Sequence, residues 1–141
     1  MRTPEYISGS KKVIEALGYW PSFHDAEVVS FSVERALPFK ADCTLARLAV
    51  HIQQYEAVGE GTPQYELVLC KSIVLRFLFQ GICALKSSDF NHQNVIDSIS
   101  VSPVTTEDRV LLAVVVESIW GFGCSLRCSS VEIEAIEALP V

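Results

Sequence analysis

The sequence predicts an α+β fold that is mainly β: an antiparallel meander sheet, strongly curled or sandwich-like, preceded by one short helix. Several segments alternate apolar and polar residues with the two-residue period of a half-buried strand. They follow one another through short connections without a regular helix between them, which argues against parallel βαβ units. The 141 residues, half of them apolar, suffice for one core. We therefore expect a single domain over residues 1–141.

The helix is expected near the N-terminus. Ser10 can cap it, and Val13, Ile14 and Leu17 then lie on one stripe. Gly18 is a C-terminal stop signal.

The first two strands are expected to pair as a hairpin. From Ala26 the period changes, and Val29, Phe31 and Val33 alternate with polar residues until residues 37–42 break the pattern. In the second strand two faces alternate. One face holds Ala46, Leu48, Val50 and Ile52, and the other holds Leu45, Arg47, Ala49, His51 and Gln53.

The rest of the chain contains further strand candidates. After a loop at residues 59–63, residues 65–80 are rich in β-formers and place Ile73, Leu75, Phe77 and Phe79 on one face, although their two halves can be separate strands. Residues 82–90 fit either a strand or a helical turn. Beyond a polar turn at 91–94, three strands are expected, within 95–101, 110–117 and 125–136. Residues 110–116 are apolar on both faces, which predicts a central strand.

Charge and composition exclude several classes of partner. Eleven basic and seventeen acidic residues give a net charge of −6, and the only adjacent basic pair is Lys11-Lys12. This distribution disfavours nucleic acid and anionic membranes. The start of the chain has no apolar signal region, and the longest aliphatic run, residues 110–116, is too short to cross a membrane. Five cysteines without tight spacing are typical of reduced core packing, so we expect a cytoplasmic protein.

The most unusual segment, residues 18–28, crowds three aromatic residues, a histidine and two carboxylates together. If strand alternation extends back to Asp25, then Asp25 and Glu27 point to the same side as Val29, Phe31 and Val33. One interpretation is a metal or acid–base site built from His24, Asp25 and Glu27. Alternation sends His24 away from both carboxylates, however. We favour a structural interpretation, in which Trp20 and Phe23 close one end of the core and the carboxylates accept hydrogen bonds.

Other chemistry has weaker support. A cysteine could pair with His51 or His92, but no cysteine lies in a recognisable catalytic motif. Gly121-Phe122-Gly123 fits a hairpin turn better than a phosphate loop. We therefore predict no catalytic residue, no metal site and no cofactor. Glu132 and Glu134 should project together from the last strand, either as a solvated face or, with Glu117, as an acidic surface for a basic protein partner.

Two segments resemble bacterial polymorphic-toxin immunity proteins, and among them immunity protein family fifty. They are Trp20-Pro21-Ser22-Phe23-His24-Asp25-Ala26-Glu27-Val28, the first motif, and Phe90-Asn91-His92-Gln93-Asn94-Val95-Ile96, the second motif. The resemblance implies a small cytoplasmic, largely β protein that is encoded beside a toxin and neutralises it by binding. It places Trp20, Phe23, His24, Asp25 and Glu27 on the first motif and Gln93 and Asn94 on the second, as fold-defining or partner-binding residues.

The leading hypothesis is therefore a non-enzymatic immunity protein that binds a cognate bacterial toxin domain stoichiometrically. Two alternatives stay open at this point. One is a small metal-dependent hydrolase that uses His24, Asp25 and Glu27, and the other is a non-catalytic homo-oligomeric structural module that associates through a sheet edge.

Overall fold

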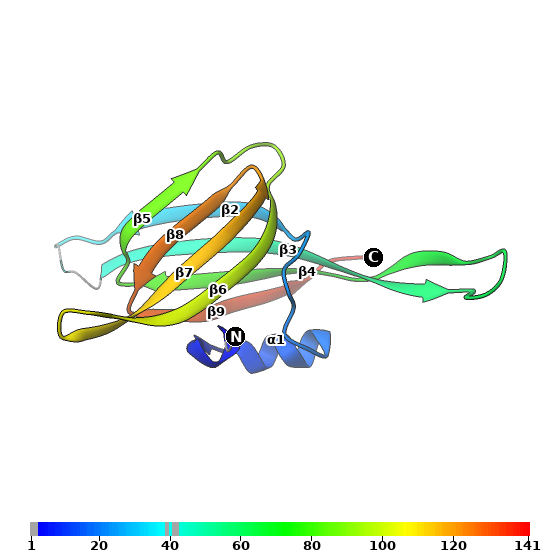
Figure 1. The fold of residues 1–141 in the computed structure, drawn as a ribbon, viewed down its shortest axis with the longest axis horizontal. Helices are drawn as coiled ribbons and strands as arrows, with labels where there is room; N and C mark the ends of the chain where they lie inside the picture. Colours follow the sequence, from blue (N-terminus) through cyan, green and yellow to red (C-terminus); the bar gives the residue numbers. More distant parts are fainter. Residues whose placement is uncertain (1–2, 39, 41–42) are drawn as a thin grey trace.

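A computed structural model describes residues 3–38, 40 and 43–141, and confirms the mainly β, α+β class. Its nine strands form one mixed sheet in the order β1-β9-β4-β3-β2-β6-β7-β8-β5, which is not closed (Figure 1). The elements are the 3-10 helix η1 (Thr3–Tyr6), β1 (Ile7–Ser8), α1 (Ser10–Leu17), β2 (Glu27–Arg35), β3 (Thr44–Val58), β4 (Glu66–Gln80), β5 (Cys83–Ser88), β6 (Val95–Thr106), β7 (Arg109–Trp120), β8 (Gly123–Cys128) and β9 (Ser130–Ala138).

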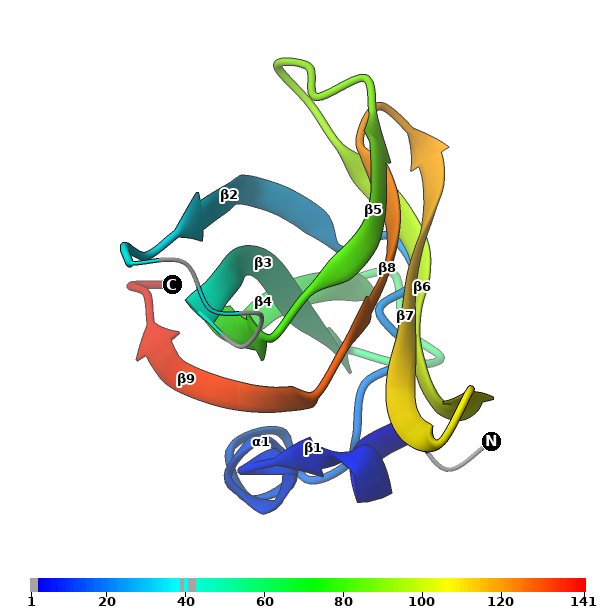
Figure 2. The same cartoon turned by 90° about the vertical axis from the view of Figure 1, so that its left-hand side faces the viewer.

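Two antiparallel meanders, β2-β3-β4 and β6-β7-β8, make up most of the sheet. They join where Glu27 of β2 pairs with Val95 of β6. β9 extends the first meander, β1 adds to β9 in parallel, and β5 forms the edge beside β8. The sheet curls so that β2, β3, β4 and β9 lie on one side and β5, β6, β7 and β8 on the other (Figure 2). The predicted curl is therefore present.

The core lies between the two halves of the curled sheet. The expected alternation in β3 and β4 is confirmed, because Leu48, Val50, Leu75, Phe77 and Phe79 are all buried in one cluster. Inward side chains of β6, β7 and β8 complete it. Fully burying one large apolar side chain stabilises a fold by about 1.5–3 kcal/mol, so this cluster is the main source of stability.

The predicted helix is α1, although its N-cap differs from expectation. Gly9, with φ +86°, occupies the N-cap position, while the Ser10 hydroxyl donates instead to the Pro4 carbonyl oxygen at 2.9 Å. Gly18 ends the helix as predicted, with φ +90° and its N–H donating to the Ile14 carbonyl oxygen. Among the described residues, no helix is both long and apolar enough to cross a membrane.

A β-bulge between Val28 and Ser30 overturns the expected register at the start of β2. Val28 is 2% exposed and Val29 is 48% exposed, so Val28 and not Val29 is in the core. Glu27 pairs with His51 on the outer face, whereas Phe31 pairs with Leu48 on the core face. Glu27 therefore does not share a side with Phe31 and Val33, because the extra residue inverts the alternation between them.

Other boundaries also differ from the sequence-based expectation. Residues 66–80 form one continuous strand, and residues 83–88 form the strand β5. The segment expected over 125–136 divides into β8 and β9 at Ser129. The predicted break at 37–42 lies between β2 and β3, and its Phe39, Ala41 and Asp42 fall outside the described residues.

The predicted role of the cysteines in core packing applies to only some of them. Cys124 and Cys128 are buried on β8, and burial raises the pKa of each thiol to about 12. Cys70 on β4 and Cys83 on β5 are exposed instead.

Candidate functional site

The first motif forms the connection from α1 to β2, and its backbone is strained. Phe23 and Asp25 have φ values of +65° and +66°, a region that costs a non-glycine residue about 1–2 kcal/mol. The Phe23 ring offsets this cost because it is 3% exposed and packs against Trp20 and Phe77, with centroid distances of 5.6 Å and 6.0 Å. As expected, Trp20 and Phe23 close one end of the core.

Local hydrogen bonds hold this turn and direct its polar side chains outward. The His24 N–H donates to the Ser22 hydroxyl oxygen, and the Ala26 N–H donates to the Phe23 carbonyl oxygen. The Asp25 N–H donates across to the Ile96 carbonyl oxygen of β6 at 3.0 Å. His24 and Asp25 are consequently exposed while the aromatic residues of the motif pack inward.

The second motif lies directly against the first. The Gln93 side-chain amide donates to Oε1 of Glu27 at 3.2 Å. The Val28 N–H donates to the Asn94 carbonyl oxygen at 2.9 Å, and the Ile96 N–H donates to the Ala26 carbonyl oxygen at the same distance. The two segments that carry the family resemblance therefore form one continuous structure, at the point where the halves of the sheet meet.

Asn94 is the buried centre of this junction. Its Nδ2 donates to the carbonyl oxygens of Val28 and Asn91, and its Oδ1 accepts the N–H groups of Asn91 and Phe122. The side chain is 3% exposed and all its hydrogen-bonding capacity is directed inward. Asn94 is thus buried and fully hydrogen-bonded, whereas Gln93 is exposed.

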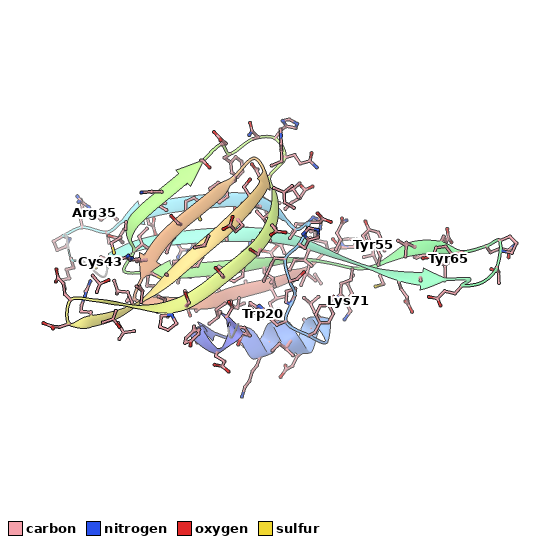
Figure 3. All side chains as sticks on the ribbon, viewed as in Figure 1. Trp20, Arg35, Cys43, Tyr55, Tyr65 and Lys71 are labelled. Carbon is pink, nitrogen blue, oxygen red and sulfur yellow. The ribbon has the colours of Figure 1, made fainter. Side chains whose placement is uncertain are left out.

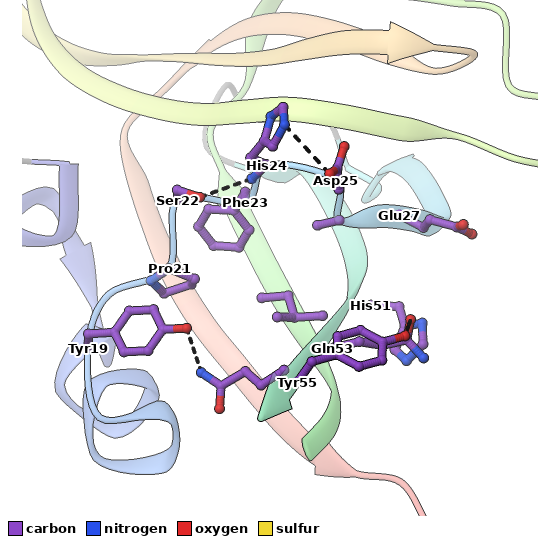
Figure 4. Close-up of a pocket in the computed structure, with 13 residues that line it drawn as sticks. Tyr19, Pro21, Ser22, Phe23, His24, Asp25, Glu27, His51, Gln53 and Tyr55 are labelled. Carbon is purple, nitrogen blue, oxygen red and sulfur yellow. Dashed lines mark hydrogen bonds and ion pairs between the residues drawn. The ribbon is translucent and has the colours of Figure 1, made fainter. Parts of the chain in front are cut away.

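A pocket of about 370 Å³ opens beside the first motif (Figure 4). One wall comes from the first motif and the other from β3. The Tyr19 hydroxyl accepts a hydrogen bond from the Gln54 amide at 2.7 Å and so closes one end. We call this the motif pocket; it is lined by Tyr19, Pro21, Ser22, Phe23, His24, Asp25, Ala26, Glu27, His51, Ile52, Gln53, Gln54 and Tyr55.

The geometry does not favour the metal-site alternative. The expectation that alternation sends His24 away from Asp25 is wrong, because Asp25 has a positive φ and is not part of the strand. His24 lies between two carboxylates, with Nδ1 at 2.8 Å from Oδ1 of Asp97 and Nε2 at 3.5 Å from Oδ2 of Asp25. Glu27 instead accepts a hydrogen bond from Gln93. Within residues 3–38, 40 and 43–141, no group of three or more histidine, cysteine or acidic side chains is arranged to hold a metal ion.

The two histidines considered as catalytic bases have other neighbours. His51 Nε2 lies 2.7 Å from Oγ of Ser72, a residue that is 6% exposed on β4. The His92 ring packs edge-on against Trp120, with a centroid distance of 5.4 Å.

The three residues expected to form an acidic surface lie in two places. Glu132 and Glu134 are both on β9, and Glu134 pairs with Arg47 at 3.1 Å. Arg47 also pairs with Glu34, and the hydrogen bond to Glu134, followed by that to Glu34, raises the pKa of Arg47. Glu117 lies on β7 opposite Ser98, in the other half of the sheet. The structure therefore does not unite Glu117 with the other two.

Sequence reasoning missed several residues that line the motif pocket or its rim. His51 and Gln53 were assigned to the correct face of β3, but their proximity to the first motif follows from the pairing of Glu27 with His51. Asp97, which contacts His24, lies at a bulge in β6 between Ile96 and Ser98. No local sequence signal marks that contact.

Comparison with known proteins places this arrangement in a family. The model of the family described as immunity protein 50 matches residues 9–139, which include both motifs. Neither a search of curated proteins nor a search of solved structures finds a match. Because the family match spans nearly the whole chain, from the start of α1 to the end of β9, the chain belongs to the immunity protein 50 family.

Proposed function

We propose that this protein neutralises a cognate bacterial toxin domain by stoichiometric binding, in the cytoplasm of the cell that produces both. The observation that carries the proposal is the family match over residues 9–139. The fold suits such a role, because a rigid curled sheet presents preformed surfaces, and a stable interface typically buries about 1,600 Å² in total.

The burial of the potential nucleophiles Cys124, Cys128 and Ser72 also supports binding rather than catalysis. The thiols of Cys124 and Cys128 are buried, and their pKa values of about 12 keep them protonated at neutral pH. The Ser72 hydroxyl contacts His51, but its burial on a paired strand keeps it from a substrate. We therefore assign these groups to packing.

The motif residues divide into two proposed roles. Trp20, Phe23 and Asn94 point inward and shape the site. His24, Asp25, Glu27 and Gln93 reach solvent around the motif pocket and are available to a partner. A separate acidic surface at Glu132 and Glu134, or at Glu117, is the alternative proposed location for the partner.

The test is co-expression with the toxin domain encoded in the neighbouring reading frame, with growth and co-purification measured together. We expect growth rescue and a complex of one copy of each protein. The matched control pairs the same toxin with an immunity protein from an unrelated family. Absence of both rescue and complex, with both proteins folded by circular dichroism, would refute the proposal.

A further inference from the structure

The outer parts of β3 and β4 form a two-stranded arm that projects from the body of the protein (Figure 1). We define the arm as residues 55–70. The pairing of β2 with β3 ends at His51, and the pairing of β9 with β4 ends at Ile73. Among the described residues, no third strand pairs with the arm. A two-stranded ribbon is only marginally stable by itself in water, so a folded, unsupported arm suggests that a partner completes it.

One face of the arm is entirely apolar or aromatic. Tyr55 pairs directly with Leu69 and Ala57 with Leu67, and directly paired residues share a face. Tyr65, directly before β4, lies two residues before Leu67, so it continues the alternation of Leu67 and Leu69, and it lies nearer the tip than Tyr55 (Figure 3). Tyr55, Tyr65 and Leu67 are 55%, 54% and 61% exposed. This arm face therefore displays large apolar side chains to solvent, as protein-binding surfaces do.

The charges of the arm specify the kind of partner. Glu56 and Glu66 lie on the opposite face and Glu60 at the tip, while residues 55–70 contain no lysine or arginine. The arm thus carries three of the negative charges of the chain without compensation. Lys71, at its root, reaches α1 instead, where its Nζ donates to the Ala16 carbonyl oxygen at 2.7 Å.

The arm face is continuous with the motif pocket, because Tyr55 belongs to both. The pocket adds the carboxylates of Asp25 and Glu27, and its lining within the described part of the chain includes neither lysine nor arginine. We propose that the arm face and the motif pocket together form the toxin-binding surface, which takes a basic protein surface with an apolar centre and a lysine or arginine that enters the pocket. This inference rests on the proposed function and locates its interface.

A second copy of this chain fits the same surface less well. Two arms placed together would bring six uncompensated carboxylates into one interface, in a protein whose net charge is already −6. Aromatic anchors on an arm of negative charge suit a partner of opposite charge, which electrostatic attraction also steers towards the arm.

The apolar part of the proposal is tested with Tyr65→Ser and Leu67→Ser. Each should weaken binding to the toxin domain, measured by calorimetry, by about tenfold or more, as expected for central interface anchors. The matched control is Val110→Ser, because Val110 is an apolar residue on the β6-β7 hairpin that is at least as exposed as Tyr65 and Leu67. Unchanged affinity in both arm variants would overturn the proposal.

The electrostatic part is tested by comparing two triple variants with the same change in charge. Glu56→Lys/Glu60→Lys/Glu66→Lys alters the arm, and Glu107→Lys/Asp108→Lys/Glu117→Lys alters the β6-β7 hairpin; each brings the net charge from −6 to 0. We expect the arm variant to reduce the association rate about tenfold and the hairpin variant to change it much less. Equal effects, or a larger effect of the hairpin variant, would contradict the assigned location.

Replacing residues 55–70 by Asn-Gly leaves Gln54 and Lys71 joined by a two-residue hairpin turn and removes the arm without cutting the chain. If the wild type binds and protects but this folded variant does neither, the proposal is supported. If the variant still binds, the interface is elsewhere while the proposed function stands. If the wild type itself neither binds nor protects, both proposals fail, and light scattering then shows whether the arm joins two copies instead.

Discussion

Asn94 and Val28 are joined by two hydrogen bonds: the Val28 N–H donates to the Asn94 carbonyl oxygen at 2.9 Å, and Nδ2 of Asn94 donates to the Val28 carbonyl oxygen at 3.3 Å. These bonds lie where β2 meets β6, at the junction between the two halves of the sheet. The same side chain reaches Phe122, so one buried amide connects three segments that are distant in sequence.

Asn94→Ala should destabilise the protein by about 2–4 kcal/mol, because it leaves the buried N–H of Phe122 and the carbonyl oxygen of Val28 without their side-chain partner. Gln93→Ala is the adjacent control and should change the free energy of unfolding by less than about 0.5 kcal/mol, since Gln93 is exposed. Urea denaturation measures both. Similar losses in the two variants would contradict the central role of Asn94.

Asp25→Ala should be less stable than Asp25→Gly by about 1 kcal/mol. The φ of +66° at this position favours glycine, and the exposed Asp25 side chain contributes little packing that either variant would lose. The comparison uses the same denaturation experiment. At Ser22, which has no positive φ, the order should reverse, with alanine the more stable.

The two buried thiols predict a loss of stability at high pH. Burial raises the pKa of Cys124 and Cys128 to about 12 in the folded protein, above the value near 9 of an exposed thiol. Their contribution is therefore complete below pH 9 and is lost as the pH rises towards 12, with a slope approaching about 1.4 kcal/mol per pH unit for each thiol.

Cys124→Ala/Cys128→Ala should consequently show a shallower fall in unfolding free energy between pH 9 and 11 than the wild type. The control is Cys70→Ala/Cys83→Ala, which removes exposed thiols and should leave the wild-type slope. If the unfolding free energy of all three proteins fell with pH at the same slope, the buried thiols would not be the cause of the loss of stability at high pH.

Amide hydrogen exchange should separate the arm from the body. We expect the amides of residues 55–70 to exchange much faster than those of residues 45–52 in β3, because the strands of the arm have only one strand partner at each position. In the complex with the toxin domain, protection should increase in the arm. Equal protection of both stretches in the free protein would contradict the description of the arm as an unsupported two-stranded ribbon.

The faces of β3 and β4 could be predicted because alternation is a local signal: Ala46 to Ile52 and Ile73 to Phe79 show it directly in the sequence. The bulge after Val28 could not be predicted, since it depends on how β2 pairs with β3. The same holds for the arm. Tyr65 and Leu67 are residue types that are typical of buried strands, so the sequence does not predict that they are exposed. They are exposed because, among the described residues, no third strand pairs with the arm.

For the site, the sequence located the first motif and the core positions of Trp20 and Phe23. It did not locate the pocket, because the second wall comes from Gln53 and Tyr55, more than two dozen residues away in the chain. The pairing of strands that are distant in sequence brings these residues together, and local sequence patterns do not specify that pairing.

The parallel pairing of β1 with β9 limits when β1 can fold during synthesis. Ile7 of β1 is made before its strand partner Val131, which follows more than a hundred residues later in the chain. At about 5–20 residues per second, roughly 6–25 seconds of translation separate them. β1 therefore stays without its strand partner during this time, and its pairing with β9 is a late step in the folding of each new molecule.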